Sequence, residues 1–262
     1  MRISIVTPSF NQARYIKRTI DSVLDQQGDF ELEYNVLDGG STDGTIEILK
    51  SYGDRLTWVS ERDGGQVDAI NKGLRAATGD VVGWINSDDL LLPGALARVV
   101  DAFKSQRDLE WVHGRCVIID EHDREVRRWV SAYKHYRCRN HSFDNFLTED
   151  YVSQMTTFWK RSVQDEIGYV DPNIRFAFDY EYFLRLAKRG APHYIEEPTA
   201  CFRWYPESKS GGGYVVQMTE TNDIALRYSS TVWTRLRARA KKHGIINVYR
   251  ALAVARSLVK RS

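Results

Sequence analysis

The alternation of strand and helix patterns in the first third of the chain is the feature that most constrains its fold. Short runs rich in β-branched residues are each followed by apolar residues at helical spacing. Strands that alternate with helices in this way are typical of βαβ units, which place their strands in a parallel, twisted sheet. We expect strands at 2–8, 33–37, 56–60 and 81–85, and helices over 16–24 and 66–77. The segment 41–45 is expected to open a further helix that includes Ile46, Leu49 and Lys50.

The pattern changes after about residue 108. Residues 121–150 are charged and aromatic without a clear period, so no element is predicted there. The length of 262 residues and the 42% hydrophobic content suit one large α/β domain, or one domain with an appendage. In this part we expect strands at 111–119 and 156–160, a helix at 179–189 and a glycine-rich loop at 208–213.

The charge of the chain is nearly balanced but unevenly distributed. The formal net charge of +2 gives no global signal for nucleic-acid binding, and none is expected. Nine Lys and Arg and no Asp or Glu lie between residues 235 and 262, which predicts a basic helical tail. Such a tail could lie on an anionic membrane surface, or it could pack on the domain with its basic face in water.

The cysteine pattern and the lack of long apolar segments indicate a reducing, intracellular compartment. The three cysteines are far apart and form no CxxC pair. We find no apolar signal segment and no uninterrupted apolar stretch that approaches a membrane span. We therefore expect a cytoplasmic protein, either free or peripheral on the inner face of the plasma membrane.

Two adjacent carboxylates, Asp88 and Asp89, follow closely on the apolar run 81–85. A buried strand has no solvent for carboxylates at its end unless that end opens into a cleft. Hard cations such as Mg²⁺ and Mn²⁺ prefer carboxylate oxygens and often bridge to phosphates. The alternative is a capping pair for the helix after Pro93, but that cap is expected near Leu92, after both carboxylates.

Polar residues also follow the other predicted strands. The segment 7–11 ends the first strand, Asp38 ends the second, and ligands of open α/β sheets bind at these carboxyl ends. Asp38 is placed to accept a hydrogen bond from a nucleotide base, or alternatively to form an Asx-turn before Gly39. Asn11 has a similar alternative as the cap of the first helix. No G-x-G-x-x-G and no Walker A motif is present, which disfavours dinucleotide-binding and P-loop proteins.

Four stretches of the chain resemble the family 2 glycosyltransferases of the GT-A fold. They cover most of residues 3–100 in the family's order and spacing, and the resemblance continues more weakly to about residue 210. It is similar to bacterial members that act in surface-polysaccharide or glycolipid assembly. The matching stretches are 4–12 (SIVTPSFNQ), 37–45 (LDGGSTDGT), 63–73 (DGGQVDAINKG) and 79–89 (GDVVGWINSDD).

The resemblance implies a GT-A fold, with a Rossmann-like, mostly parallel central sheet flanked by helices. Residues 1–214 would form the catalytic domain, divided into a nucleotide-sugar-binding half (1–108) and an acceptor-side half (109–214). Residues 215–262 would form the basic helical extension.

The same resemblance implies a donor site for a nucleotide-diphospho-sugar, with UDP favoured. Asp38 would read the base, and residues 86–89 would be the DxD-like motif. The family often has Asp where this chain has Asn86, so Asp88 and Asp89 must contribute more. The implied donor-site residues are Thr7, Pro8, Ser9, Phe10, Asn11, Asp38, Asp68, Asn71, Asn86, Ser87 and Asp88.

A divalent cation, Mn²⁺ or Mg²⁺, is the implied cofactor. Asp89 is the first choice for direct contact with it, and Asp88 is the second. In a later matching segment the family often has a His two residues after an Arg, whereas this chain has Tyr205 two residues after Arg203. A third protein ligand is therefore not expected. Arg203 or Lys209 would contact the diphosphate; each is alternatively a solvated surface charge.

Residues 178–185 match the family region that carries the catalytic base. Inverting transfer needs a carboxylate that takes the proton of the acceptor hydroxyl. Asp179 matches that role, and Glu181 is the reserve. The family often has Glu before the Asp, and this chain has Phe178. The alternative for Asp179 is a helix cap.

These inferences predict a metal-dependent, inverting glycosyltransferase that acts on a hydroxyl of a glycan or lipid-linked acceptor. Two alternatives remain. A sugar nucleotidyltransferase would need a glycine-rich, basic loop after the first strand, which 7–15 lacks. A non-catalytic sugar-nucleotide-binding assembly protein would bind the donor without turnover.

Overall fold

A computed structural model describes residues 1–209 and 213–240. Its centre is an eight-stranded sheet in the order β3-β2-β1-β4-β7-β6-β8-β5. Strands β3, β2, β1 and β4 are parallel, as predicted, while β7 is antiparallel to both of its neighbours. The strands are β1 (Arg2–Ser9), β2 (Glu31–Asp38), β3 (Thr57–Ser60), β4 (Val81–Trp84), β5 (Leu90–Leu91), β6 (Trp111–Ile119), β7 (Thr157–Lys160) and β8 (His193–Arg203).

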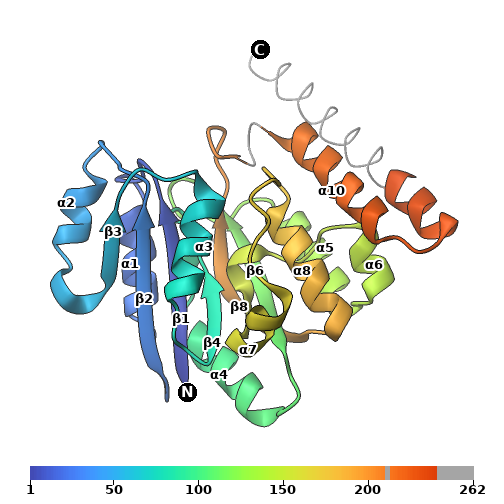
Figure 1. The fold of residues 1–262 in the computed structure, drawn as a ribbon, viewed down its shortest axis with the longest axis horizontal. Helices are drawn as coiled ribbons and strands as arrows, with labels where there is room; N and C mark the ends of the chain where they lie inside the picture. Colours follow the sequence, from blue (N-terminus) through green and yellow to red (C-terminus); the bar gives the residue numbers. More distant parts are fainter. Residues whose placement is uncertain (210–212, 241–262) are drawn as a thin grey trace.

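Helices cover both faces of the sheet (Figure 1). They are α1 (Ile16–Leu24), α2 (Thr45–Lys50), α3 (Gln66–Ala76), α4 (Ala95–Ser105), α5 (Arg128–Arg139), α6 (Phe143–Thr148), α7 (Arg161–Ile167), α8 (Phe178–Arg189) and α10 (Tyr214–Tyr228), with short 3-10 turns at Gly53–Arg55 and Gln154–Thr156. Residues 232–240 are also helical.

The strand period of two assigns side chains to two cores. Ile3 and Ile5 of β1 pack with α1 and α4 on one face, whereas Val6 packs with α3 on the other. In β4, Val81 joins the first core, and Val82 joins the second. Both cores are buried, so the register of the central strands is fixed by the apolar pattern.

The second core is largely aromatic. Trp84 of β4 lies edge-on to Trp159 of β7, with ring centroids 5.5 Å apart, and nearly parallel to Phe183 of α8 at 5.9 Å. Such offset and edge-to-face pairs add to the burial energy. This packing holds α8 against the middle of the sheet, and with it the predicted catalytic base.

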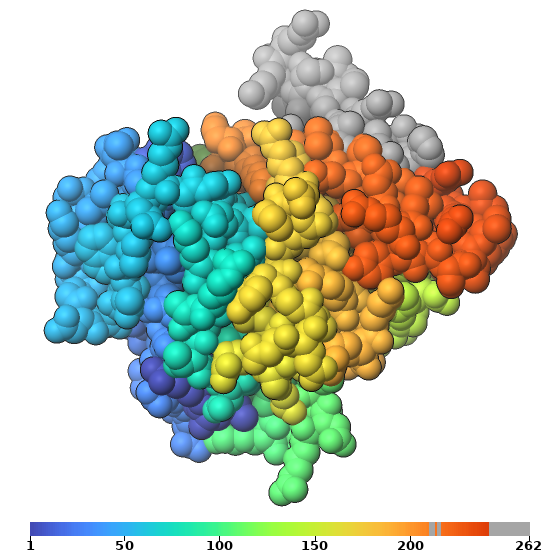
Figure 2. Space-filling model, in the orientation of Figure 1, coloured from blue at the N-terminus to red at the C-terminus, as the bar shows by residue number. Residues whose placement is uncertain are grey.

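Helix α3 approaches β1 unusually closely. A Cβ on Gly73 would lie 2.3 Å from Cγ1 of Val6, so no larger side chain fits there without a shift of the helix. The close approach sets the height of the first turn of α3, which starts at Gln66 beside the carboxyl ends of the strands. Figure 2 shows α3 between the blue N-terminal segments and the red helices at the other end of the molecule.

Several local expectations were wrong. Helix α4 begins at Ala95 after Gly94, which has a left-handed φ of 76°, and not at Pro93. Neither Asn11 nor Asp179 caps a helix: α1 begins at Ile16, and α8 follows Ala177. Helices α5 and α6 occupy the segment for which no element was predicted.

The C-terminal region joins the main core. Ile224 and Ala225 of α10 are buried in the aromatic core beside α8. The residues on the two sides of the boundary predicted at residue 214 therefore pack into one core. Most of the predicted basic tail (241–262) and part of the predicted loop at 208–213 lie outside the described residues.

Candidate active site

A cavity of about 630 Å³ opens beyond the carboxyl ends of β1 and β4. Its lining brings together residues from the start, middle and end of the chain, as expected for a site at this edge of an α/β sheet. The sequence-predicted residues that line it are Pro8, Ser9, Phe10, Asn86, Ser87, Asp88, Asp179, Arg203 and Lys209.

Asp88 and Asp89 have different surroundings. Asp88 lines the cavity, and its Oδ2 accepts a hydrogen bond of 2.9 Å from the hydroxyl of Tyr205. Asp89 is fully buried; its Oδ1 accepts from the backbone N–H of Arg203, and its Oδ2 accepts from the Asn86 amide. The preference for Asp89 as the direct metal ligand is therefore not supported by this arrangement, because Asp88 is the carboxylate that faces the cavity.

Burial raises the pKa of both carboxyls. For Asp88 desolvation dominates, and the Tyr205 hydrogen bond and the nearby Arg203 oppose it. The pKa of Asp89 is raised well above its usual value, first by burial and then by the charge of Asp88. A bound cation would relieve this repulsion, so the pair is suited to hold positive charge.

Arg203 fixes the position of this pair. Its side chain has no exposed surface; Nε donates to the carbonyl of Asp88 and Nη1 to the carbonyl of Asp120, at 2.8 Å each. Nη1 also forms an ion pair of 2.5 Å with Asp123. Only Nη2 has no partner in the described part of the chain. The diphosphate contact predicted for Arg203 is therefore restricted to this one nitrogen.

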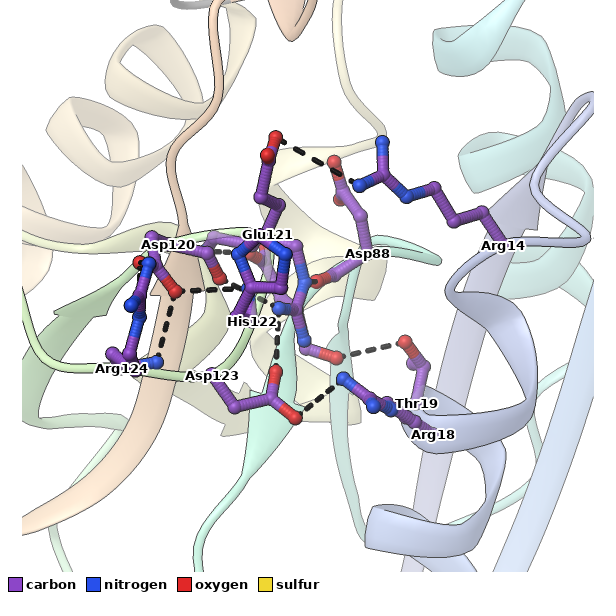
Figure 3. Close-up of polar contacts among 11 residues, drawn as sticks. Arg14, Arg18, Thr19, Asp88, Asp120, Glu121, His122, Asp123 and Arg124 are labelled. Atoms are coloured by element: carbon purple, nitrogen blue, oxygen red, sulfur yellow. Dashed lines mark hydrogen bonds and ion pairs between the residues drawn. The ribbon is translucent and has the colours of Figure 1, made fainter.

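The loop at residues 120–124 extends the same network to helix α1 (Figure 3). Asp123 pairs with Arg18 at 2.6 Å, and the carbonyl of Asp89 accepts from the Thr19 hydroxyl at 2.8 Å. On the outer side, Glu121 lies 3.8 Å from Arg14. The carboxylate pair is thus held between α1, β8 and a loop that sequence analysis left unassigned.

Tyr205 occupies the position at which the resembled family often has a His. Burial and the neighbouring Asp88 carboxylate raise the pKa of the Tyr205 phenol, so it stays protonated at neutral pH. It can therefore donate to Asp88, but it is a poor metal ligand in that form.

A chain of amides crosses the cavity floor. The Lys209 ammonium donates to Gln66 Oε1 at 2.9 Å, Gln66 Nε2 donates to Asn86 Oδ1 at 2.9 Å, and Asn86 Nδ2 donates to Gln154 Oε1 at 3.1 Å. Gln66 and Gln154 were missed in the sequence. The signal available for Gln66 was its place directly after two glycines at a helix start.

Asp38 is committed to its own turn. The side chain is buried and accepts from the N–H groups of Gly40 and Ser41 and from the hydroxyls of Ser41 and Ser60. This is the Asx-turn alternative. Its role as base reader stays a prediction, with the neighbouring Gly39 rather than Asp38 lining the cavity.

Four other predicted donor-site residues do not line the cavity. The Thr7 hydroxyl contacts Tyr34, and Asn11 holds the backbone of Thr42. Asn71 exchanges two hydrogen bonds with the backbone of Val170.

The remaining one is Asp68, which accepts from the Gly64 N–H and pairs with Lys72. From the same sequence segment, the cavity is lined instead by Asp63, packed against Gly39, and by Gln66.

Asp179 lies in the first turn of α8 and lines the cavity. One oxygen, Oδ1, accepts from the N–H of Tyr180 at 2.9 Å. Burial raises the pKa of the Asp179 carboxyl, which places it closer to the working range of a general base. Lys209 lies 4.8 Å from the ring of Phe178 and partly offsets this shift.

A second carboxyl stands behind Asp179. Asp150 has a buried Oδ1 without a partner in the described residues, and burial together with the charge of Asp179 raises its pKa to about 7. Glu181, the reserve base, does not line the cavity. It pairs with Arg185 at 2.9 Å and accepts from the Tyr228 hydroxyl at 2.6 Å.

The start of α8 is held from α10. The carboxylate of Glu220 accepts from three successive backbone N–H groups, those of Arg175, Phe176 and Ala177. These groups precede the helix that carries Asp179, so a residue of the C-terminal region positions the candidate base.

The donor set fits a divalent cation held by few protein ligands. No group of three or more His, Cys, Asp or Glu side chains forms a metal cage within residues 1–209 and 213–240. Mg²⁺ and Mn²⁺ need no such cage when one or two carboxylates, water and substrate phosphates complete the shell. Asp88 at the cavity wall, with Asp89 behind it, satisfies that requirement.

Comparison with known proteins identifies the family of this chain. The family model "Glycosyl transferase family 2" matches residues 4–168. An uncharacterized glycosyltransferase of Mycobacterium tuberculosis is 31% identical over 192 residues, which cover 71% of this chain and 68% of the relative. The hyaluronan synthase of Pasteurella multocida is 30% identical over 72% of this chain but only 19% of its own length. Another relative, an uncharacterized glycosyltransferase of Nostoc, is covered over 40% of its length.

Solved structures share the fold. S. aureus TarS 1-349 in complex with UDP-GlcNAc superposes with a TM-score of 0.68 at 16% identity, covering 91% of this chain and 69% of that chain. The mannosyltransferase PcManGT of Pyrobaculum calidifontis, in complex with GDP-Man and Mn²⁺, gives 0.63 at 18%, covering 96% and 80%. The predicted α/β GT-A architecture is confirmed, and the chain belongs to glycosyltransferase family 2.

Proposed function

We propose that this transferase is metal-dependent and inverting, and that it moves a sugar from a UDP-sugar to a hydroxyl of a glycan or lipid-linked acceptor. The observation that carries the proposal is one cavity lined by both a fixed carboxylate, Asp88, and a separate carboxyl, Asp179. Such a cavity can hold a diphosphate at one end and an acceptor at the other.

At the donor end, Asp88 would hold Mn²⁺ or Mg²⁺, with Asp89 fixing the loop behind it. The cation, when bound, offsets the charge that builds on the leaving diphosphate. Lys209 lines the same cavity and would bind phosphate oxygens. Nη2 of Arg203 has no partner among the described residues but is buried, so it would reach a phosphate only if its surroundings shift. Phe10, which is 60% exposed at the cavity rim, offers an apolar face for the base.

At the acceptor end, Asp179 would act as the general base. The acceptor oxygen attacks the anomeric carbon, the bond from that carbon to the diphosphate oxygen breaks, and the hydroxyl proton passes to the Asp179 carboxylate. Oδ2 is the oxygen that remains for this proton, because Oδ1 already accepts from the Tyr180 N–H. Attack opposite to the leaving group inverts the configuration.

The finer assignments are supported by similarity. UDP-GlcNAc is bound in the TarS structure, and GDP-Man with Mn²⁺ in PcManGT, so a nucleotide-sugar with a cation suits this fold. A mycobacterial relative, 29% identical over 70% of this chain, is named for PGL/p-HBAD biosynthesis. That name favours an envelope glycolipid as the product class.

None of the helices in the described residues has the length and apolar content to span a membrane. We propose a cytoplasmic site of action, with peripheral contact to the inner face of the plasma membrane. Of the segment 235–262 through which this contact is predicted, 241–262 lie outside the described residues.

The first experiment is thermal stabilisation by UDP, GDP, CDP and dTDP, each with and without Mn²⁺. A nucleotide at about 100 times its dissociation constant should add ~2.7 kcal/mol to the free energy of unfolding. We expect a Mn²⁺-dependent shift with UDP that is lost in Asp88→Asn and kept in Asp54→Asn, a variant of an exposed carboxylate. A shift that needs no cation would refute the metal assignment, and a shift with GDP alone would refute the UDP assignment.

A further inference from the structure

Exposed apolar side chains are concentrated on two helices. Ten large hydrophobic residues are exposed in the described part of the chain. Six of them lie on α5 and on residues 232–240, and they include two strongly exposed tryptophans. The six are Trp129 (61%), Tyr133 (45%), Tyr136 (61%), Val232 (72%), Trp233 (70%) and Leu236 (51%). Folding leaves these side chains in water, so their apolar surface remains available to a partner.

Helix α5 presents its aromatic residues outward. Trp129, Tyr133 and Tyr136 recur at the spacing of one helical face, while the small side chains Ser131 and Cys138 are buried against the sheet. This reverses the usual arrangement, in which the apolar stripe of a surface helix faces the core. The outward face is therefore the unusual feature of α5.

The helix at 232–240 is connected to α5 by hydrogen bonds to Asn145 of α6. Arg237 Nη2 donates to Asn145 Oδ1 of α6 at 3.3 Å, and Asn145 Nδ2 reaches the carbonyl of Asn140, at the end of α5, at 3.5 Å. Figure 1 shows α5 and α6 at the same end of the molecule as the red C-terminal helix. The exposed residues of both helices can therefore contribute to one surface.

The surface is positively charged. Neither α5 nor 232–240 contains Asp or Glu, and together they carry seven Lys and Arg. Three of these, Arg128, Arg137 and Arg139, pair with glutamates. Lys134 points inward and donates to Ser153. The other three are Arg235, Arg237 and Arg239, which leave the surface positive even with Asp144 of α6 counted.

This surface begins beside the active site. The guanidinium of Arg127, immediately before α5, lies 3.6 Å from the ring centroid of Trp204. Trp204 is the residue between Arg203 and Tyr205, both of which line the cavity. A partner on α5 would therefore stand close to the rim of the cavity.

We propose that α5 and residues 232–240 form a docking surface for an anionic lipid bilayer. Trp and Tyr have apolar bodies with a polar edge and are favoured at the headgroup level, and the flanking cations match anionic lipid headgroups. This inference rests on the membrane contact in the proposed function and names the surface that makes it; it does not depend on the donor or on the reaction.

The test is sedimentation of the full chain with vesicles of phosphatidylcholine alone and of phosphatidylcholine with phosphatidylglycerol. We expect binding only to the anionic vesicles, weakened by salt because exposed charges are screened beyond ~10 Å at 0.1 M. The double variants Trp129→Ala/Tyr136→Ala and Trp233→Ala/Leu236→Ala should each bind about tenfold more weakly. Val59→Ala, which changes an exposed apolar residue on β3, should bind as the unaltered chain does.

Circular dichroism and the UDP thermal shift should be unchanged in these variants, which separates this inference from the proposed function. Binding that survives in both double variants would overturn the proposal and assign lipid contact to other residues. Absence of binding to anionic vesicles would also overturn it. A dimer in solution that dissociates in Trp129→Ala/Tyr136→Ala would instead assign the surface to a second copy of the chain.

Discussion

The two ends of the cavity hold their carboxyl groups in different ways. At the donor end, the Asp88–Asp89 loop is fixed by hydrogen bonds from α1, from the loop at 120–124 and from Arg203 on β8. At the acceptor end, the Asp179 side chain accepts a hydrogen bond from the backbone N–H of its own neighbour, Tyr180. One end is built before any ligand arrives, and the other leaves an oxygen for the substrate.

This difference matches what each end has to do. A cation and a diphosphate demand fixed oxygen positions, and a preorganised site avoids the cost of ordering them during the reaction. A general base must change its protonation state, so it needs a free oxygen and a pKa raised towards neutrality. The following predictions test whether the two ends are separable in this way.

The largest effect is expected for Asp88→Asn. The substitution keeps an acceptor for Tyr205 but removes the charge that faces the cavity, so cation-dependent donor binding should be lost. A metal contributes several kcal/mol to such reactions, so kcat/KM should fall roughly 10⁴-fold. Steady-state rates over a Mn²⁺ titration measure this. A variant that stays Mn²⁺-dependent with near-normal kcat/KM would show that the donor end lies elsewhere.

Asp179→Asn should break only the acceptor end. Loss of a general base typically costs ~10²–10⁴-fold, so we expect kcat to fall about 10³-fold while the UDP thermal shift persists. Glu181→Gln is the matched control, because Glu181 is tied to Arg185 and Tyr228 and should leave kcat nearly unchanged. The reverse result, an inactive Glu181→Gln and an active Asp179→Asn, would exchange the two assignments.

Arg203→Lys should destabilise the donor end, because it removes hydrogen bonds that hold the Asp88–Asp89 loop. The shorter ammonium cannot reach the Asp88 carbonyl, the Asp120 carbonyl and Asp123 together, and it leaves buried acceptors unpaired. We expect a loss of ~3 kcal/mol in the free energy of unfolding, as for other broken buried pairs, measured by urea denaturation. Arg18→Lys, at the solvent-exposed outer pair with Asp123, should cost far less. Equal losses would mean that the buried network adds no special stability.

The smallest effect concerns Asp150 at the acceptor end. Its folded pKa of about 7 lies above that of an unfolded Asp, so its contribution to stability is complete below about pH 4 and is lost as pH rises through 7. Asp150→Asn should therefore raise the melting temperature relative to the unaltered chain at pH 8 and lose that advantage at pH 5. The acid limb of kcat/KM should keep its position, because Asp150 is already uncharged on that side of pH 7.

Scanning calorimetry and a pH–rate profile measure these shifts, with Asp144→Asn on the exposed side of α6 as the control. A pH-independent difference in melting temperature would mean that Asp150 is ionised throughout this range.

The parallel half of the fold was predictable because its signals are local. The runs at 2–8 and 81–85 are apolar and β-branched, and the observed strands end within one residue of them. Helix α5 was missed for a physical reason: it buries small residues such as Ser131 and exposes aromatics such as Trp129, so its sequence lacks the contrast that reveals an amphipathic helix.

The site was predictable where strand ends determine it. The order of strands brings Ser9 and Asp88 to one edge, and the aromatic core brings Asp179 to the same cavity. The supports of the site could not be read from the sequence. Arg203 contacts Asp88 across 115 residues, and Gln154 reaches the Trp84 carbonyl across 70, without any local pattern. Such contacts depend on the completed fold.

Glu220 links the far end of the chain to the chemistry. Its carboxylate receives the three N–H groups that precede α8, so the first turn of that helix takes its direction from α10. A chain shortened to residue 213 would keep every residue that we assign to sugar transfer, except the support on which Asp179 depends. Residues 1–213 are therefore not expected to keep the position of Asp179 when they are separated from α10. A transplant or a truncation has to carry α10 with it, or replace Glu220 by another anchor for the same three amides.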